Sequence, residues 1–419
     1  MAGSTGSLIA FYNELDHALN PALFRVVPRG SEIDVPGLIE IAEMSVPDAR
    51  VTDIILHRDT DQSVMMRMEP RIDPLTGEPY VLDFTELYLD PYTGQELGRR
   101  KFADITQGLV NLMPFIYRFH YSLALGQIGT WLLGIVAFVW TFDCFIGFYL
   151  TLPARRISRV SGRSQSVNGT EAETEIEGIG TAKDLLAPPL FPARKKSLAT
   201  RRGFWSRWGF SWKVKWHGSG QRINFDLHRA GGLWVWPMLL VFAWSAVAFN
   251  LSVQIYQPVM RVISDFRDPF SKLSKLTSPM KEPGISWREA LRRGHELMTH
   301  LAAQHDFVWL DEQSLALDRM RGVYRFSVFS DRDIGNSPGS TTVLFDADNG
   351  ELKAYRLPTG QYAGNTVTNW LYALHQGEAF GLAYRILVCA MGWLVVLLSV
   401  TGMIIWSTKR RRKSLHRKN

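Results

Sequence analysis

The sequence predicts a membrane α-helical bundle, with three full spans and a truncated first span, that carries two α+β lobes outside the membrane. Three observations predict this fold class: three long apolar runs, a one-sided distribution of basic residues, and an internal repeat. Each run has the roughly 20 apolar residues that cross a bilayer. Charged residues make up 21% of the chain, which indicates that water-exposed domains lie between the apolar runs. The runs are Ser122–Leu152, Gly231–Leu251 and Ile386–Trp406.

The basic residues orient the predicted spans. Arg155, Arg156 and Arg159 follow the first run, and the segment KRRRKSLHRK (409–418) follows the third. Because cytoplasmic loops carry the excess of Lys and Arg, we expect the loop after the first span and the C-terminus to be cytoplasmic. The net charge of +7 is thereby assigned to membrane orientation, and no nucleic-acid partner is expected. Asp143 lies within the first run and is expected to face the bundle interior, because a carboxylate in lipid is costly.

The N-terminal segment TGSLIAFYNELDHALNP (5–21) resembles the outer end of a span that runs into an external segment. Only ten residues precede Phe11, which is too short a stretch to cross a bilayer. The segment has no basic n-region and is therefore not a signal peptide. We expect the start of a fourth span to be missing.

An internal repeat relates the two halves of the chain. Tyr117, His120 and Gly126 recur as Tyr372, His375 and Gly381 at a constant offset of 255 residues. The segments ELYLDPYTGQELGRR and TVLFDADNGELKAYR both alternate apolar and polar residues around a D-x-x-x-G turn, which predicts two strand–turn–strand units. Helical patterns precede both units, in VPGLIEIAEM and in ISWREALRRGHELMTHLA. Each half is therefore expected to be a small α+β lobe followed by a span.

The expected organisation has eight segments. They are a remnant of the first transmembrane helix (1–15), the first lobe (16–112), a transmembrane helix (113–153), a basic cytoplasmic loop that is partly disordered (154–222), a second transmembrane helix (223–252), the second lobe (253–368), a third transmembrane helix (369–407) and a basic cytoplasmic tail (408–419).

Two histidines stand at equivalent positions of the repeat. His120 and His375 each precede an outside-to-inside span, so both are expected at one depth near the outer surface. They could be interfacial histidines that hydrogen-bond lipid headgroups. The sharper hypothesis is that they face each other and hold one haem iron, as imidazoles from facing helices do. Arg118 and Arg385 are near enough to neutralise haem propionates, or they anchor the interface. Nearby glycines leave room for a macrocycle or serve helix packing.

His228 begins the inside-to-outside span and is expected near the inner surface. Its partner histidine is expected on the missing part of the first helix. Cys144 and Cys389 lie in apolar runs without a C-x-x-C-H spacing, which excludes covalent c-type haem. No hydrolase, nucleotide-binding or zinc-protease motif is present in the sequence.

Five segments resemble the PepSY-associated transmembrane protein family: TGSLIAFYNELDHALNP, LDPYTGQELGRR, DLHRAGGLW, LHQGEAFG and VTGMIIW. Members of this family include inner-membrane ferric-siderophore reductases of Gram-negative bacteria. The resemblance implies four spans, two periplasmic PepSY-like lobes and b-type haem on span histidines. If the family's haem ligands are carried over to this chain, the resemblance implies that His120 and His375 would bind the outer haem and that His228 would bind an inner haem.

The resulting hypothesis is a multi-pass electron-transfer protein of the bacterial inner membrane with a cytoplasmic C-terminus. It would take electrons from a quinol or a cytoplasmic donor and pass them to a periplasmic acceptor, such as a ferric-siderophore complex, and would then be an oxidoreductase. An alternative is a non-enzymatic PepSY module that binds or regulates a periplasmic partner. A third possibility is a haem protein that serves another acceptor.

Overall fold

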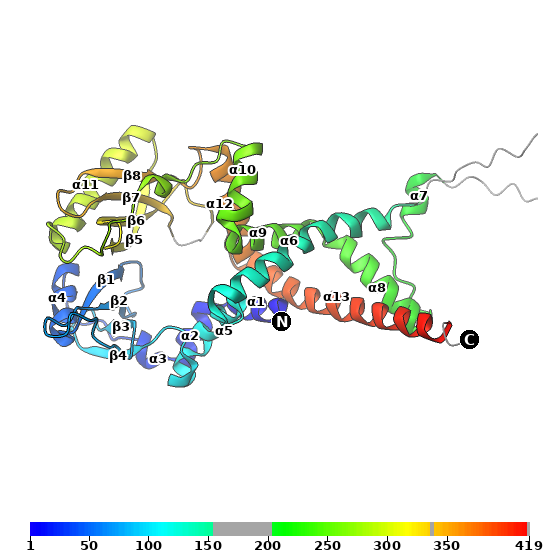
Figure 1. Ribbon diagram of the computed structural model, residues 1–419, viewed down its shortest axis with the longest axis horizontal. Coiled ribbons are helices and arrows are strands. Elements are labelled where there is room, and N and C mark those ends of the chain that lie inside the picture. Colours follow the sequence, from blue (N-terminus) through cyan, green and yellow to red (C-terminus); the bar gives the residue numbers. More distant parts are fainter. Residues whose placement is uncertain (154–202, 336–338, 417–419) are drawn as a thin grey trace, which may run out of the picture.

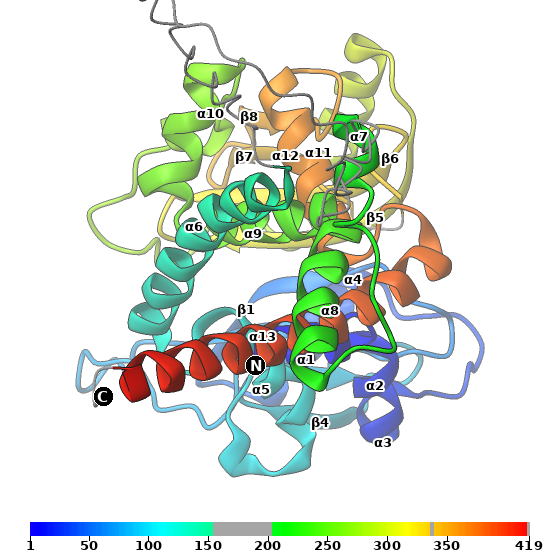
Figure 2. The same ribbon diagram turned by 90° about the vertical axis from the view of Figure 1, so that its right-hand side faces the viewer.

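The computed structural model describes residues 1–153, 203–335 and 339–416. A β-sheet with covering helices forms one end of the molecule, and long apolar helices form the other (Figure 1). Figure 2 looks from the helical end toward the sheet and shows α8 and α13 in front of it. The predicted disordered loop at 161–180 and the end of the basic tail lie outside the described residues.

The sheet is one antiparallel sheet of eight strands in the order β4-β3-β2-β1-β5-β6-β7-β8. The sequence predicts two lobes, and the structure joins their strands into this single sheet. The junction is the pairing of β1 with β5, in which Ile54 lies opposite Leu315. Pairing satisfies the backbone groups that two separate lobes would leave exposed at these edges. The strands are β1 (Ala49–Ile55), β2 (Val64–Pro70), β3 (Glu86–Leu89), β4 (Glu96–Arg100), β5 (Trp309–Asp318), β6 (Val323–Ser330), β7 (Thr341–Asp346) and β8 (Leu352–Arg356).

The two ends of the sheet repeat each other residue by residue. Glu86 on β3 lies opposite Arg100 on β4, and Thr342 on β7 lies opposite Arg356 on β8. Both pairs of strands also shift register at the same place, after Tyr88 in one and after Leu344 in the other. The predicted strand–turn–strand units are therefore present.

Helices α4 (Val35–Ser45) and α11 (Trp287–His305) form where the sequence predicts helices. Each begins with a side-chain cap: Asp34 accepts a hydrogen bond from the Gly37 amide, and Ser286 accepts one from the Glu289 amide. Such caps satisfy amides that lack a partner within the helix. Both helices pack on the sheet over one shared apolar core. Fully buried members of this core are Leu38, Ile54, Met66, Met298, Tyr324 and Phe326.

Among the described residues, two helices are long and apolar enough to cross a membrane, α6 (Gly126–Thr151) and α13 (Gly381–His416). In α13 the stretch that could span the membrane is Gly381–Arg412. A third crossing exists if α8 (Gly220–Trp234) and α9 (Trp236–Asn250) together form one span. The predicted second span is not one straight helix, because α8 and α9 meet at 72°. Pro237 lies in the first turn of α9, where its missing N–H breaks the ladder of helical hydrogen bonds.

A short helix precedes each long one. Helix α5 (Leu112–Ser122) precedes α6, and α12 (Ala363–Gln376) precedes α13. The predicted first span therefore starts at Gly126, because Leu123 and Ala124 adopt left-handed backbone conformations that end α5. Gly126 and Gly381, which are equivalent in the repeat, have φ angles of 58° and 70°. Both halves thus contain the same break between a short and a long helix.

The first helix of the chain, α1 (Ala2–Ile9), packs against α13. The Ser7 hydroxyl donates to the Cys389 carbonyl at 2.7 Å, and Gly3 approaches Gly392 so closely that a Cβ would lie 2.4 Å from the Gly392 oxygen. The remaining helical segments are α2 (Tyr12–Leu19), α3 (Pro21–Phe24), η1 (Ile105–Gln107), η2 (Leu109–Asn111), α7 (Phe204–Trp208), η3 (Ser252–Tyr256), α10 (Gln257–Ile263) and η4 (Pro269–Lys272).

Asp143 does not face the bundle interior, so this prediction is wrong. Its side chain is exposed, whereas the next residue, Cys144, is buried among apolar residues of the bundle. Successive residues of a helix point about 100° apart. Cys144 takes the interior position because its carbonyl accepts a hydrogen bond from the Trp236 indole at 2.7 Å, which fixes this face of α6 against α9.

Candidate functional site

The structure brings the rings of His120 on α5 and His375 on α12 into edge-on contact. Their ring centroids lie 6.4 Å apart, and the ring planes meet at 73°. A metal–nitrogen bond to imidazole is about 2 Å long, so two imidazoles on one ion have centroids about 6 Å apart. The observed spacing therefore fits two rings that share one metal ion.

Both rings are held through the same nitrogen. Nδ1 of His120 lies 2.9 Å from the Thr5 hydroxyl of α1, and Nδ1 of His375 is hydrogen-bonded to the Ser245 hydroxyl of α9. Metal-binding histidines are typically oriented by a hydrogen bond on the ring nitrogen that does not bind the metal. Nε2 is therefore the atom that a metal ion would take on each ring.

Aromatic side chains surround the second of these histidines. Phe242 and Phe249, both on α9, each lie 5.3 Å from the His375 ring in edge-on contact. Tyr372 stacks on Phe249 at a centroid distance of 4.5 Å. On the other side, Gly6 of α1 leaves the space that the His120 ring fills, because a Cβ there would lie 3.3 Å from His120 Cε1. Four helices thus enclose the histidine pair.

The glycines near the pair divide into two groups. A Cβ at Gly126 or at Gly381 would meet nothing within 4 Å, so both positions border open space. A Cβ at Gly129 would lie 1.7 Å from the Ser122 carbonyl oxygen, and one at Gly377 would lie 3.4 Å from Arg385 Cα. Helix packing therefore explains Gly129 and Gly377.

The two arginines lie on the helices of the histidine pair. Arg118 is on α5, two residues before His120. Arg385 is in the first turn of α13, forms an ion pair with Glu14 and lies 6.0 Å from the centre of the Phe11 ring. The structure thus gives Arg385 a carboxylate partner. A role of either arginine toward haem propionates stays a prediction.

His228 lies in α8 against α13. Its Nδ1 is 3.1 Å from both the Leu398 carbonyl and the Thr401 hydroxyl. Gly402 makes room for the ring, because a Cβ there would lie 3.1 Å from His228 Cε1. This ring, like those of His120 and His375, is held through its Nδ1. In the described part of the chain, no second histidine ring lies against it.

The described residues contain no group of three or more His, Cys, Asp or Glu side chains with the geometry to hold a metal ion. A site built from protein ligands alone therefore has no support among them. Two facing imidazoles are the complete protein contribution to a six-coordinate haem iron, since the porphyrin supplies the other four nitrogens. The donor set around His120 and His375 fits this group.

Sequence reasoning missed the two hydroxyls that orient the histidines. Serine and threonine in apolar helices usually hydrogen-bond a carbonyl of the preceding turn, and Ser245 also does so, with Val241 at 2.6 Å. Nothing in the sequence marks Thr5 or Ser245 as partners of a histidine. Two further histidines have partners that the sequence did not reveal: His57 contacts Asp311, and His17 stacks on Phe24.

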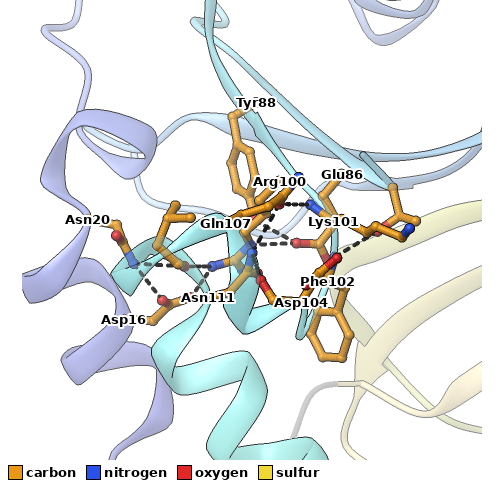
Figure 3. A network of polar contacts seen from close by, with 12 residues as sticks. Asp16, Asn20, Glu86, Tyr88, Arg100, Lys101, Phe102, Asp104, Gln107 and Asn111 are labelled. Atoms are coloured by element: carbon orange, nitrogen blue, oxygen red, sulfur yellow. Dashed lines mark hydrogen bonds and ion pairs between the residues drawn. The ribbon is translucent and has the colours of Figure 1, made fainter. Parts of the chain in front are cut away.

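A buried ionic network joins the sheet to the helices below it (Figure 3). Arg100 of β4 donates to Glu86 at 2.7 Å and to Asp16 of α2 at 2.8 Å. The Tyr88 hydroxyl donates to the same Glu86 carboxylate at 2.9 Å. Each of these four side chains is less than 5% exposed. The network fixes α2, and hence the chain leading from α1, to the first half of the sheet.

The fold and the site together define a membrane protein in which a duplicated α+β unit carries apolar helices with paired histidines. The model of the PepSY-associated TM region family matches residues 1–169 and 197–409, and the chain belongs to this family. No curated protein matches the chain with significance.

Proposed function

We propose that this chain is a b-type haem electron-transfer protein of the bacterial inner membrane that reduces a periplasmic acceptor, with ferric-siderophore iron as that acceptor. One observation carries the proposal: two histidines from duplicated halves meet at 6.4 Å, and each has its Nδ1 bonded to a hydroxyl. Histidines that only hydrogen-bond lipid headgroups would not need to contact each other, and their Nδ1 atoms would not need to be bonded to hydroxyls in the same way.

The protein residues have distinct roles in this proposal. His120 and His375 would be the axial ligands of the outer haem, which supplies one-electron chemistry when bound. Thr5 and Ser245 hold the two imidazoles in place. The apolar helices around the pair exclude water. His228 would serve an inner haem in the same way, with Leu398 and Thr401 as its anchors.

The direction of transfer follows from the expected orientation. The basic residues after α6 and α13 support a cytoplasmic location for those helix ends. A quinol or a cytoplasmic donor would deliver electrons there, near His228. The sheet then faces the periplasm. One quinol releases two electrons and two protons and so reduces two ferric ions to Fe(II). Ferrous iron is the softer ion and binds the hard oxygen ligands of a siderophore more weakly, which releases the metal.

Optical spectra of the purified full-length chain test the proposal. We expect reduced-minus-oxidised spectra with b-type haem bands that His120→Ala or His375→Ala removes or strongly diminishes. His300→Ala is the matched control, because His300 is exposed on α11, far from the bundle. A folded wild-type chain without haem would overturn the proposal and favour a non-enzymatic module that binds a periplasmic partner.

A further inference from the structure

The repeat provides an internal comparison for one arginine. Arg100 and Arg356 occupy equivalent places on β4 and β8, as the identical register of the two strand pairs shows. Arg100 is neutralised by two buried carboxylates, one of which, Glu86, lies directly opposite on β3 (Figure 3). The residue opposite Arg356 is Thr342, which carries no charge. The second half of the sheet therefore has an arginine at the position of Arg100, but a neutral threonine at the position of Glu86.

The side chain of Arg356 donates a hydrogen bond to the Asn369 side-chain oxygen of α12 at 2.7 Å. The two carboxylates whose charges act on Arg356 accept hydrogen bonds from other groups. Asp333 accepts hydrogen bonds from Ser330, Ser340 and Thr341, and Asp268 accepts one from the Phe270 amide. Burial lowers the pKa of the Arg356 guanidinium below its usual range, as expected for a partly desolvated cation without an ion-pair partner among the described residues.

A cavity of about 240 Å³ opens beside this arginine, between the sheet and α12. Its wall includes Glu378, whose Oε2 atom is buried and has no hydrogen-bond partner among the described residues. An unpaired polar atom in a buried position is costly unless a ligand or a water satisfies it. The polar wall consists of Ser340, Arg356, Asn369, Tyr372, Gln376 and Glu378.

The cavity is connected to the histidine pair through aromatic contacts. Tyr372 forms part of the wall and stacks on Phe249 at 4.5 Å, and Phe249 contacts His375 at 5.3 Å. Gln376, also in the wall, follows His375 directly on α12. A molecule in the cavity would therefore be separated from the His375 ring by two aromatic side chains.

We infer that this cavity binds an anionic, oxygen-rich ligand that also carries a hydroxyl or N–H donor, such as a small polycarboxylate iron chelate. The anionic oxygens would accept hydrogen bonds from Arg356, and the donor would satisfy Glu378. Charge-assisted hydrogen bonds to a partly buried guanidinium are the strong kind. Electron transfer to the bound chelate rests on the proposed function. Binding of the chelate to this cavity does not depend on that function.

Equilibrium dialysis of gallium(III) citrate against the full-length chain in detergent tests the binding, because gallium matches ferric iron in charge and is not reduced. We expect saturable binding to the wild type that Arg356→Gln weakens at least about tenfold. Gln376→Phe should weaken it similarly by filling the cavity, since Gln376 is exposed and its replacement keeps the fold. Arg292→Gln, which removes a cation from the exposed face of α11, should have no effect.

The inference would be overturned if the wild type did not bind gallium citrate, or if Arg356→Gln and Gln376→Phe bound it as tightly as the wild type. An altered haem spectrum in Arg356→Gln would also overturn it, because the arginine would then serve the cofactor. Failure of the proposed function has another signature: a chain without haem bands that still binds gallium citrate through Arg356.

Discussion

His120 and His375 contact each other at a ring-centroid distance of 6.4 Å although 255 positions separate them in the sequence. Each lies in the last turn of a short helix that a left-handed break separates from a long apolar helix. Because the two halves share this geometry, a single histidine in the repeat unit becomes a pair of histidines in contact in the duplicated chain.

The hydroxyls that hold the rings should influence haem retention. Replacing them by Thr5→Val and Ser245→Ala leaves Nδ1 of both histidines without its partner, and loss of such outer contacts typically weakens metal binding about 10–100-fold. Haem content per chain after purification, with a titration of added haem, measures the effect. Thr130→Val is the control, because among the described residues that hydroxyl bonds only the Gly126 carbonyl of its own helix. Unchanged haem affinity in the double variant would contradict the assigned role.

The Arg100 network should dominate the stability of the first half of the sheet. Arg100→Met leaves Asp16 and Glu86 buried without a counter-charge, which typically costs about 3–5 kcal/mol. The neighbouring Arg99→Met removes a partly exposed pair with Glu96 and a cation–π contact with Phe84, and should cost about 1–2 kcal/mol. Chemical unfolding of the detergent-solubilised chain compares the two variants. Equal destabilisation would show that the buried network is not the main contribution.

The joined sheet should behave as one cooperative unit. Ile54 is fully buried where β1 pairs with β5, and Ile54→Ala removes contacts worth about 2–5 kcal/mol. We expect faster amide hydrogen exchange in β5 and β6 as well as in β1 and β2. Exchange that accelerates only in β1–β4 would mean that the two lobes unfold independently. Met44→Ala, at an exposed position of α4, is the control.

The pair of His295 on α11 and Glu312 on β5 predicts a pH dependence. The Glu312 carboxylate, as hydrogen-bond acceptor of the protonated His295 ring, raises the pKa of His295, and His295 Nε2 lies 2.6 Å from Glu312 Oε1. A histidine with a raised folded-state pKa adds stability that is complete below its unfolded pKa of about 6.5. This stability is lost as the pH rises through the folded-state value. Glu312→Gln should flatten the fall in melting temperature above about pH 6.5; an unchanged profile would contradict this assignment.

The sequence predicts the local elements well, and the repeat explains why. Alternating residues around a D-x-x-x-G turn define β3–β4 and β7–β8, and caps at Asp34 and Ser286 define the starts of two helices. The pairing of β1 with β5 could not be predicted, because it joins strand edges more than 250 residues apart and leaves no local pattern. The break before Pro237 was open to prediction, but proline is tolerated in many membrane helices.

The site was predictable only in part. Equal spacing in the repeat identifies His120 and His375, whereas their anchors Thr5 and Ser245 come from other helices and carry no motif. The position of Asp143 was mispredicted, because the cost of a carboxylate in lipid argues for the interior, while packing of Cys144 against α9 decides the orientation of the helix.

Low-temperature electron paramagnetic resonance of the oxidised, full-length chain tests the central claim most directly. Two imidazoles on one ferric haem give a low-spin signal, and the 73° angle between the His120 and His375 rings predicts a strongly anisotropic one. We expect His375→Ala to abolish this signal or convert it into a high-spin one. A wild-type chain without this strongly anisotropic low-spin signal, or the same signal surviving in both His120→Ala and His375→Ala, would contradict the account.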